Sequence, residues 1–102
     1  IDELAIMQPT ALLINTCRGS VIDQSALVAA LRQGQILGAG LDVFTPEPLP
    51  PDHPLLELPN VLLTPHIAGI TRDTWCRRGQ FAFANLRRVQ NGNQPLAQIG
   101  AS

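Results

Sequence analysis

Apolar residues along the chain come in short runs separated by amphipathic stretches. Residues 11–14 form a continuous apolar run, which is typical of a strand covered on both faces. We expect two more strands, at residues 36–44, where Gly38 and Gly40 permit close backbone approach, and at residues 61–64. Short strands that alternate with helices predict parallel pairing.

Three helical segments are expected around these strands. Residues 2–7 fit the end of a helix. Asp23 is suited to cap the start of a second helix, and Gly34 stands where a glycine commonly follows a helix end. Thr71 or Asp73 can cap a last helix, whose aromatic side chains are expected to pack in a core. The apolar stripe of that helix consists of Trp75, Gly79, Ala82, Leu86 and Val89.

Residues 45–59 carry six prolines and are expected to form an irregular loop. The order is then strand, helix, strand, loop, strand, helix. This order predicts an α/β chain that forms part of a doubly wound parallel sheet.

The composition narrows the class of protein. A chain of 102 residues allows at most one domain, and its hydrophobic fraction of 45% with 15% charged residues argues against intrinsic disorder. The net charge of -1 gives no reason to expect binding to nucleic acid, and no apolar run is long enough to span a membrane. We therefore expect neither a nucleic-acid nor a membrane partner. The two cysteines, Cys17 and Cys76, cannot form a metal site by themselves, and Cys17 is expected to be a buried residue. We expect a cytoplasmic protein without a metal.

Charged or titratable residues follow each of the three expected strands. Arg18 follows the first strand, Asp42 and Glu47 follow the second, and His66 follows the third. Ligands bind beyond the carboxyl ends of parallel strands, so these side chains predict a site. A histidine oriented by a carboxylate can move a proton, and an arginine can bind a carboxylate. Together they could hold a 2-oxo acid and protonate its carbonyl, whereas a hydride would have to come from a redox cofactor.

Four motifs that include these residues resemble the D-isomer-specific 2-hydroxyacid dehydrogenases. They are NTCRGSVID at 15–23, GAGLDVF at 38–44, EP at 47–48 and TPHIAG at 64–69, within a similarity that extends over about residues 1–96. The resemblance implies a Rossmann-type sheet and a homodimer. It also implies that the cofactor is NAD or NADP. The implied reaction is reversible hydride transfer between NAD(P)H and a 2-oxo acid, which gives a D-2-hydroxy acid.

The resemblance assigns roles to individual residues. Arg18, Glu47 and His66 are implied to be catalytic. Arg18 would anchor the substrate, His66 would shuttle the proton, and Glu47 would hydrogen-bond His66. Asp42 would lie beside the nicotinamide carboxamide. The residues implied to bind the cofactor are Thr16, Cys17, Arg18, Asp42, His66, Ile67, Ala68 and Gly69.

The family's Gly-x-Gly-x-x-Gly turn and its separate substrate domain have no counterpart among these residues. We therefore expect residues 1–102 to be the C-terminal portion, or half, of an NAD(P)-binding domain from a longer two-domain chain. Alone, this fragment is expected to be inactive. It is also expected to associate with itself or with the missing N-terminal portion, because a divided sheet exposes apolar surface. The alternatives are a non-catalytic Rossmann-like binding or interaction module and an inert remnant. The residues leave open which 2-hydroxy acid is used, and whether the cofactor is NAD or NADP.

Overall fold

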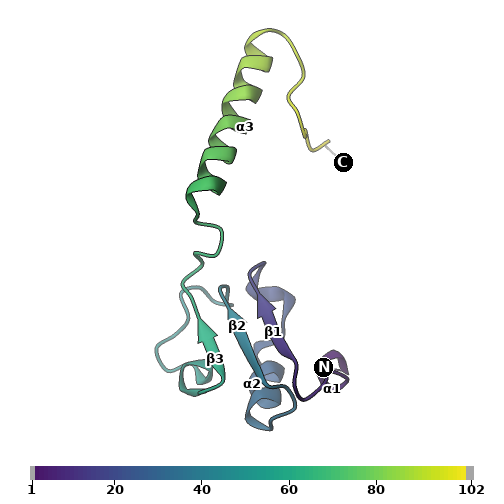
Figure 1. Cartoon of the computed structure of the whole chain (residues 1–102), viewed down its shortest axis with the longest axis vertical. Coiled ribbons are helices and arrows are strands. Elements are labelled where there is room, and N and C mark those ends of the chain that lie inside the picture. Colours follow the sequence, from purple (N-terminus) through teal and green to yellow (C-terminus); the bar gives the residue numbers. More distant parts are fainter. Residues whose placement is uncertain (1, 101–102) are drawn as a thin grey trace. The chain divides into compact units, whose positions relative to one another are not determined.

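The computed structural model describes residues 2–100 (Figure 1). The chain divides into two compact units, the first ending at Ala68 and the second beginning at Gly69. Each unit is described by itself below.

The first unit is built on a parallel sheet of three strands. These are β1 (Leu12–Asn15), β2 (Gly38–Leu41) and β3 (Val61–Leu63), and they lie in the order β1-β2-β3. The predicted parallel α/β architecture is confirmed. Strand β2 is shorter than the predicted strand at residues 36–44, because the backbone after Asp42 turns away, and the Phe44 N–H binds the Glu47 carboxylate instead of a strand.

The helices of this unit are short. They are α1 (Asp2–Ala5), the 3-10 turn η1 (Gly19–Val21), α2 (Gln24–Arg32) and the 3-10 turn η2 (Pro54–Glu57). The predicted cap is confirmed, since the Asp23 carboxylate accepts the N–H groups of Ser25 and Ala26. Gly34 follows the end of α2 with a φ of 65°.

The prediction that residues 45–59 hold no regular structure is wrong at η2. His53 caps this turn with its ring Nδ1, which accepts the Leu55 N–H at 3.2 Å. Pro54 stands in the first turn, where a missing N–H costs nothing and a fixed φ favours the helical conformation. Leu55 is 1% exposed, so η2 contributes a core residue.

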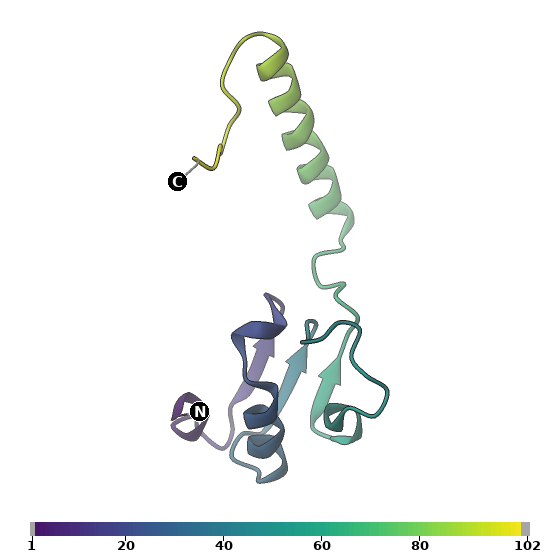
Figure 2. The same cartoon turned by 180° about the vertical axis from the view of Figure 1, so that it is seen from behind.

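Helix α2 covers one face of the sheet, as the view from behind shows (Figure 2). The core beneath it is made of apolar side chains from α2, the strands and η2. Its buried members are Leu27, Val28, Leu31, Ile36, Ala39, Leu41 and Leu55. This core holds the strands in register, and with them the segments that follow their carboxyl ends.

The opposite face of the sheet is uncovered within the first unit. Leu12 and Ile14 of β1 and Leu62 of β3 are 62%, 67% and 71% exposed. Gly38 and Gly40 lie between them on β2, and the added Cβ of an alanine at Gly38 would come within 2.6 Å of the Asn60 carbonyl oxygen. The centre of this face is therefore bare backbone flanked by apolar side chains.

We expect the 102-residue chain to self-associate through this open face, because burying a leucine side chain contributes about 1.5–3 kcal/mol. Sedimentation velocity at increasing concentration measures the effect. Leu62→Ser should weaken association by roughly tenfold or more. Leu56→Ser, which alters an exposed leucine of η2, should not. A wild-type chain that stays monomeric at every concentration would contradict the prediction.

The second unit contains one long helix, α3 (Arg72–Gln90), and a segment that follows it. Thr71 caps the helix, since its Oγ1 accepts the Thr74 N–H at 3.1 Å. Of the two candidate caps, Thr71 is therefore the one used. Asn85 accepts the Leu96 N–H at 2.7 Å, which holds the segment after the helix against it.

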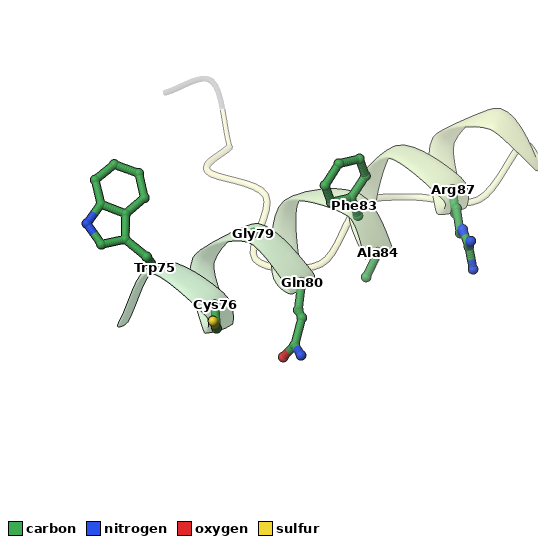
Figure 3. A pocket seen from close by; sticks show the side chains of 7 residues that line it. All are labelled: Trp75, Cys76, Gly79, Gln80, Phe83, Ala84 and Arg87. Atoms are coloured by element: carbon green, nitrogen blue, oxygen red, sulfur yellow. The ribbon is translucent and has the colours of Figure 1, made fainter. Parts of the chain in front are cut away.

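The prediction that the aromatic residues of this helix are core residues is wrong for this chain. No residue of α3 is buried, and Trp75 and Phe81 are 60% and 47% exposed. Figure 3 shows a shallow hollow along the helix, with Trp75 and Phe83 pointing to one side and Gln80 and Arg87 to another. Every residue that lines the hollow belongs to α3, so no other element of this unit borders it.

Across the part of the chain that the structure describes, no helix is both long and apolar enough to cross a membrane.

Candidate functional site

Backbone hydrogen bonds join the last residue of β1 to the segment that follows β2, and that segment to the one that follows β3. The Asp42 N–H donates to the Asn15 carbonyl, and the His66 N–H donates to the Asp42 carbonyl, both at 2.9 Å. The backbone pairing therefore continues past the ends of β2 and β3 and brings Asp42 and His66 together at the carboxyl edge, beside the end of β1.

His66 and Glu47 form the central pair of this edge. The His66 Nδ1 lies 2.8 Å from the Glu47 Oε2, and the two side chains are 51% and 35% exposed. The hydrogen bond from His66 lowers the pKa of Glu47, with a further contribution from the Phe44 N–H, which donates to Oε1 at 2.8 Å. Glu47 is therefore an ionised acceptor, so Nδ1 carries a proton and Nε2 is left for other chemistry.

The backbone of His66 adopts a left-handed conformation with a φ of 54°. Residues other than glycine rarely do so. The His66 N–H donates to the Asp42 carbonyl at 2.9 Å and to the Thr64 carbonyl at 3.1 Å, which holds this conformation in place. Backbone strain of this kind is common at functional sites.

Asp42 is 3% exposed and binds the segment that contains His66. Its Oδ1 accepts the Thr64 hydroxyl and the Ile67 N–H, the latter at 2.8 Å, and its Oδ2 accepts the Ala68 N–H at 2.9 Å. Burial alone would raise the pKa of Asp42, but these three hydrogen bonds outweigh it and leave the pKa below its usual value. Asp42 therefore fixes residues 66–68 against the end of β2.

We expect the free energy of unfolding to fall as the pH drops below about 4. The folded-state pKa values of Asp42 and Glu47 are both lowered, so their contribution is complete above the unfolded values of about 3.9 and 4.3. It is then lost as the pH falls through the lowered folded values. Urea midpoints measured from neutral pH down to about pH 2 test this dependence.

The pKa values of Glu3 and Asp23 are lowered too, so these two carboxylates also contribute to the pH dependence of the free energy of unfolding. Variants are therefore needed to separate the contribution of Asp42 from theirs. Asp42→Asn should make the free energy of unfolding depend less steeply on pH in the acid range. Asp52→Asn, at an exposed loop carboxylate, should leave this dependence unchanged. Equal slopes in wild type and Asp42→Asn would show that the Asp42 hydrogen bonds do not contribute to the acid dependence.

Arg18 lies in the turn after β1 and is exposed. Its Nη1 donates to the Cys17 carbonyl at 2.6 Å, which leaves other guanidinium N–H groups for a ligand. The charge of Arg18 also contributes, after the stronger effects of His66 and Phe44, to the lowered pKa of Glu47.

The turn itself depends on Asn15, which is 6% exposed. The Asn15 Oδ1 accepts the Cys17 N–H at 3.0 Å, and its Nδ2 donates to the Arg18 carbonyl at 2.9 Å. Thr16, Cys17 and Arg18 are exposed as a result, and the chain returns to the interior only at the buried Gly19. The expectation that Cys17 is buried is therefore wrong.

A hollow of about 350 Å³ lies beside the His66–Glu47 pair. Its walls combine these two polar side chains with apolar ones from the proline-rich segment. The lining residues are Phe44, Glu47, Pro48, Leu49, Pro65 and His66. The hollow along α3 is larger, at about 750 Å³, but contains none of the predicted site residues.

Reasoning from the sequence did not assign site roles to Asn15, Thr64 or Gln24. Asn15 and Thr64 lie inside the quoted motifs, and an asparagine after an apolar run is a common turn signal. Gln24 had no such signal, because its partner Thr45 is 21 residues away. Gly69 begins the second unit, and its part in the site stays a prediction.

A profile of the D-isomer specific 2-hydroxyacid dehydrogenase NAD-binding domain matches residues 1–68, which carry all of this geometry. The chain belongs to this family. The resemblance drawn from the four motifs is confirmed, as is the Rossmann-type fold class.

Several dehydrogenases of the family are similar over almost the whole chain. Glyoxylate reductase of Korarchaeum cryptofilum is 49% identical over 94 residues, which are 92% of this chain and 28% of that protein. A D-isomer specific 2-hydroxyacid dehydrogenase of Xanthobacter autotrophicus, solved with NADPH and MES, is 42% identical with a TM-score of 0.83. The match covers 97% of this chain and 40% of that one.

D-lactate dehydrogenase of Lactobacillus jensenii, solved with NAD+, is 28% identical with a TM-score of 0.86, over 98% of this chain and 34% of that one. The predicted cofactor, NAD or NADP, is confirmed for this dehydrogenase family. The chain spans 28% to 40% of the lengths of these three relatives.

Proposed function

We propose that this chain supplies the nicotinamide-side half of the active site of a longer, two-domain oxidoreductase. That enzyme would interconvert a 2-oxo acid and a D-2-hydroxy acid, as part of a homodimer in the cytoplasm. The observation that carries the proposal is the 2.8 Å contact between the His66 Nδ1 and the Glu47 Oε2 at the carboxyl edge of a parallel sheet. The fraction of each relative's length that the chain covers supports the proposal that it is a portion of a longer protein.

The chemistry of the edge suits a nicotinamide cofactor. The exposed backbone of residues 16–18 follows β1, while residues 66–68 are held in place by Asp42. The Asp42 Oδ2 accepts one N–H group, so it keeps a lone pair that could accept a carboxamide N–H. In this proposal Thr16, Cys17 and Arg18 lie along one side of the nicotinamide, and His66, Ile67, Ala68 and Gly69 border the other.

NAD(P)H, when bound, supplies the hydride that reduces the carbonyl carbon of the 2-oxo acid. Arg18 binds the substrate carboxylate through its guanidinium N–H groups. His66 donates the proton on Nε2 to the carbonyl oxygen, so that hydride and proton together convert the carbonyl to a hydroxyl. Glu47 accepts the proton on Nδ1 in a hydrogen bond and stabilises the cationic ring. Solvent then returns a proton to Nε2, and the oxidation of the hydroxy acid runs through the same groups in reverse.

The test begins with the intact mass of the polypeptide expressed from its native gene. We expect a mass about three times 11.0 kDa, as a second domain would require. The purified protein should then oxidise NADPH or NADH with glyoxylate or hydroxypyruvate, and should release the D isomer on chiral analysis. A gene product of 11.0 kDa that binds neither dinucleotide would overturn the proposal.

A further inference from the structure

Gln24, the first residue of α2, forms a paired contact with the segment that carries Glu47. Its side-chain Nε2 donates to the Thr45 carbonyl at 2.6 Å, and its Oε1 accepts the Thr45 N–H at 3.0 Å. One amide thereby satisfies both polar groups of the Thr45 backbone. The contact links the end of α2 that Asp23 caps to a segment 21 residues further along the chain.

Thr45 follows Phe44, which is one of the two residues that hold the Glu47 carboxylate in place, and it precedes Glu47 by two positions. The Phe44 N–H donates to the Glu47 Oε1 at 2.8 Å, and the Glu47 Oε2 lies 2.8 Å from the His66 Nδ1. Residues 45–48 belong to no helix or strand, and both prolines lack an N–H. Secondary structure therefore does not fix this segment, which is exposed from Thr45 to Pro48.

We propose that Gln24 is a positioning residue, which holds Thr45 so that the Glu47 carboxylate meets the Nδ1 of His66. The inference rests on the proposed function for its effect on turnover, but not for its effect on His66. Helix α2 is packed into the core through Leu27 and Leu31, so Gln24 connects a rigid element to an exposed segment. Without Gln24 the segment can shift, and Nδ1 loses its fixed acceptor.

The experiment compares Gln24→Ala with wild type by two measurements. In the 102-residue chain, nitrogen–proton correlation spectra of the imidazole report which ring nitrogen carries the proton at a pH where His66 is neutral. We expect mostly Nδ1–H in wild type and a shift towards Nε2–H in Gln24→Ala. In the longer enzyme of the proposed function, we expect kcat to fall about tenfold or more, since small misplacements of a catalytic group cost factors of this size. The KM for the dinucleotide should change little.

Two further variants make the comparison specific. Gln33→Ala removes an exposed glutamine at the other end of α2, whose side chain contacts that of Gln35 at 3.2 Å, and it should match wild type in both measurements. Gln24→Glu keeps an acceptor for the Thr45 N–H and loses the donor to the Thr45 carbonyl. Its ring protonation and its kcat should therefore lie between those of wild type and Gln24→Ala. Backbone amide spectra of each variant establish that the first unit is folded, and Gln24→Glu replaces Gln24→Ala as the test if the latter unfolds.

Each result has one meaning. If a folded Gln24 variant keeps the wild-type ring protonation and the wild-type kcat, the positioning role is overturned. If Gln33→Ala has the same effects as Gln24→Ala, the effect is general to α2 and the role is likewise overturned. If the ring protonation shifts in Gln24→Ala while the wild-type enzyme turns over no 2-oxo acid, the positioning role stands and the proposed function fails.

Discussion

Replacing His66 with alanine is expected to lower the kcat of the proposed enzyme by about 100-fold or more, which is the usual contribution of a positioned acid or base. The reason is that the Glu47 contact occupies Nδ1 of the His66 ring, which leaves Nε2 for proton transfer to the substrate in the proposed mechanism. Alanine keeps the backbone contacts of residue 66, because the N–H still donates to Asp42 and Thr64. Steady-state turnover with saturating NADPH and 2-oxo acid measures the change.

Glu47→Gln refines this prediction. A glutamine oxygen can still accept the proton on the His66 Nδ1, but it carries no charge to stabilise the cationic ring. We expect a smaller loss of kcat than in His66→Ala. His53→Ala is the matched control, because His53 caps η2 and lies outside the walls of the hollow beside His66. Wild-type turnover in His66→Ala would remove His66 from the mechanism.

Replacing Gly19 with alanine is expected to lower the free energy of unfolding of the first unit by about 3 kcal/mol or more, at the upper end of the cost of overpacking. An added Cβ would lie 2.1 Å from both the carbonyl carbon and the oxygen of Phe44, and 2.6 Å from the Thr45 Oγ1. Backbone atoms cannot move aside as the end of a flexible side chain can. The turn that carries Arg18 would therefore be pushed away from the segment that carries Glu47.

Urea unfolding of the first unit, followed by far-ultraviolet circular dichroism, measures this loss. Gly79→Ala is the control, because the added Cβ would meet no atom within 4 Å. Since alanine is favoured over glycine inside a helix by about 1 kcal/mol, Gly79→Ala should stabilise α3. A Gly19→Ala variant as stable as wild type would show that the turn can shift without cost, and that the close packing of Gly19 is not required.

The close contact at Gly19 and the paired contact at Gln24 act on the same short segment. Gly19 packs against Phe44 and Thr45, and Gln24 binds the Thr45 backbone. The segment that presents Glu47 is thus held by two neighbouring parts of the chain that precede it by more than twenty residues. Substitutions at either position should act on His66 without touching it.

Asp42 has a structural role in addition to the role predicted for it in cofactor binding. The sequence placed it near the end of the second expected strand, at residues 36–44, and the resemblance implied its role beside the nicotinamide. The structure ends β2 at Leu41, so that Asp42 follows the strand directly. The structure adds that its carboxylate binds Thr64, Ile67 and Ala68. In this arrangement Asp42 shapes the edge of the site even before a cofactor binds.

The sequence by itself determined the parallel α/β architecture, the N-cap at Asp23 and the set of strand-end residues that includes Arg18, Glu47 and His66. These features depend on local apolar periodicity, on capping chemistry and on the rule that parallel strands end at one edge. Each can be recognised from short segments or from their order along the chain.

Only the tertiary structure decided how those residues meet. The His66–Glu47 contact, the Asp42 hydrogen bonds and the Gln24–Thr45 pair join residues that lie 19 to 26 positions apart. Such contacts depend on how the segments cross in space, and neither periodicity nor propensity encodes that. The same reason explains the aromatic residues of α3: periodicity correctly indicated which residues share a face, but only packing determines whether another element covers that face.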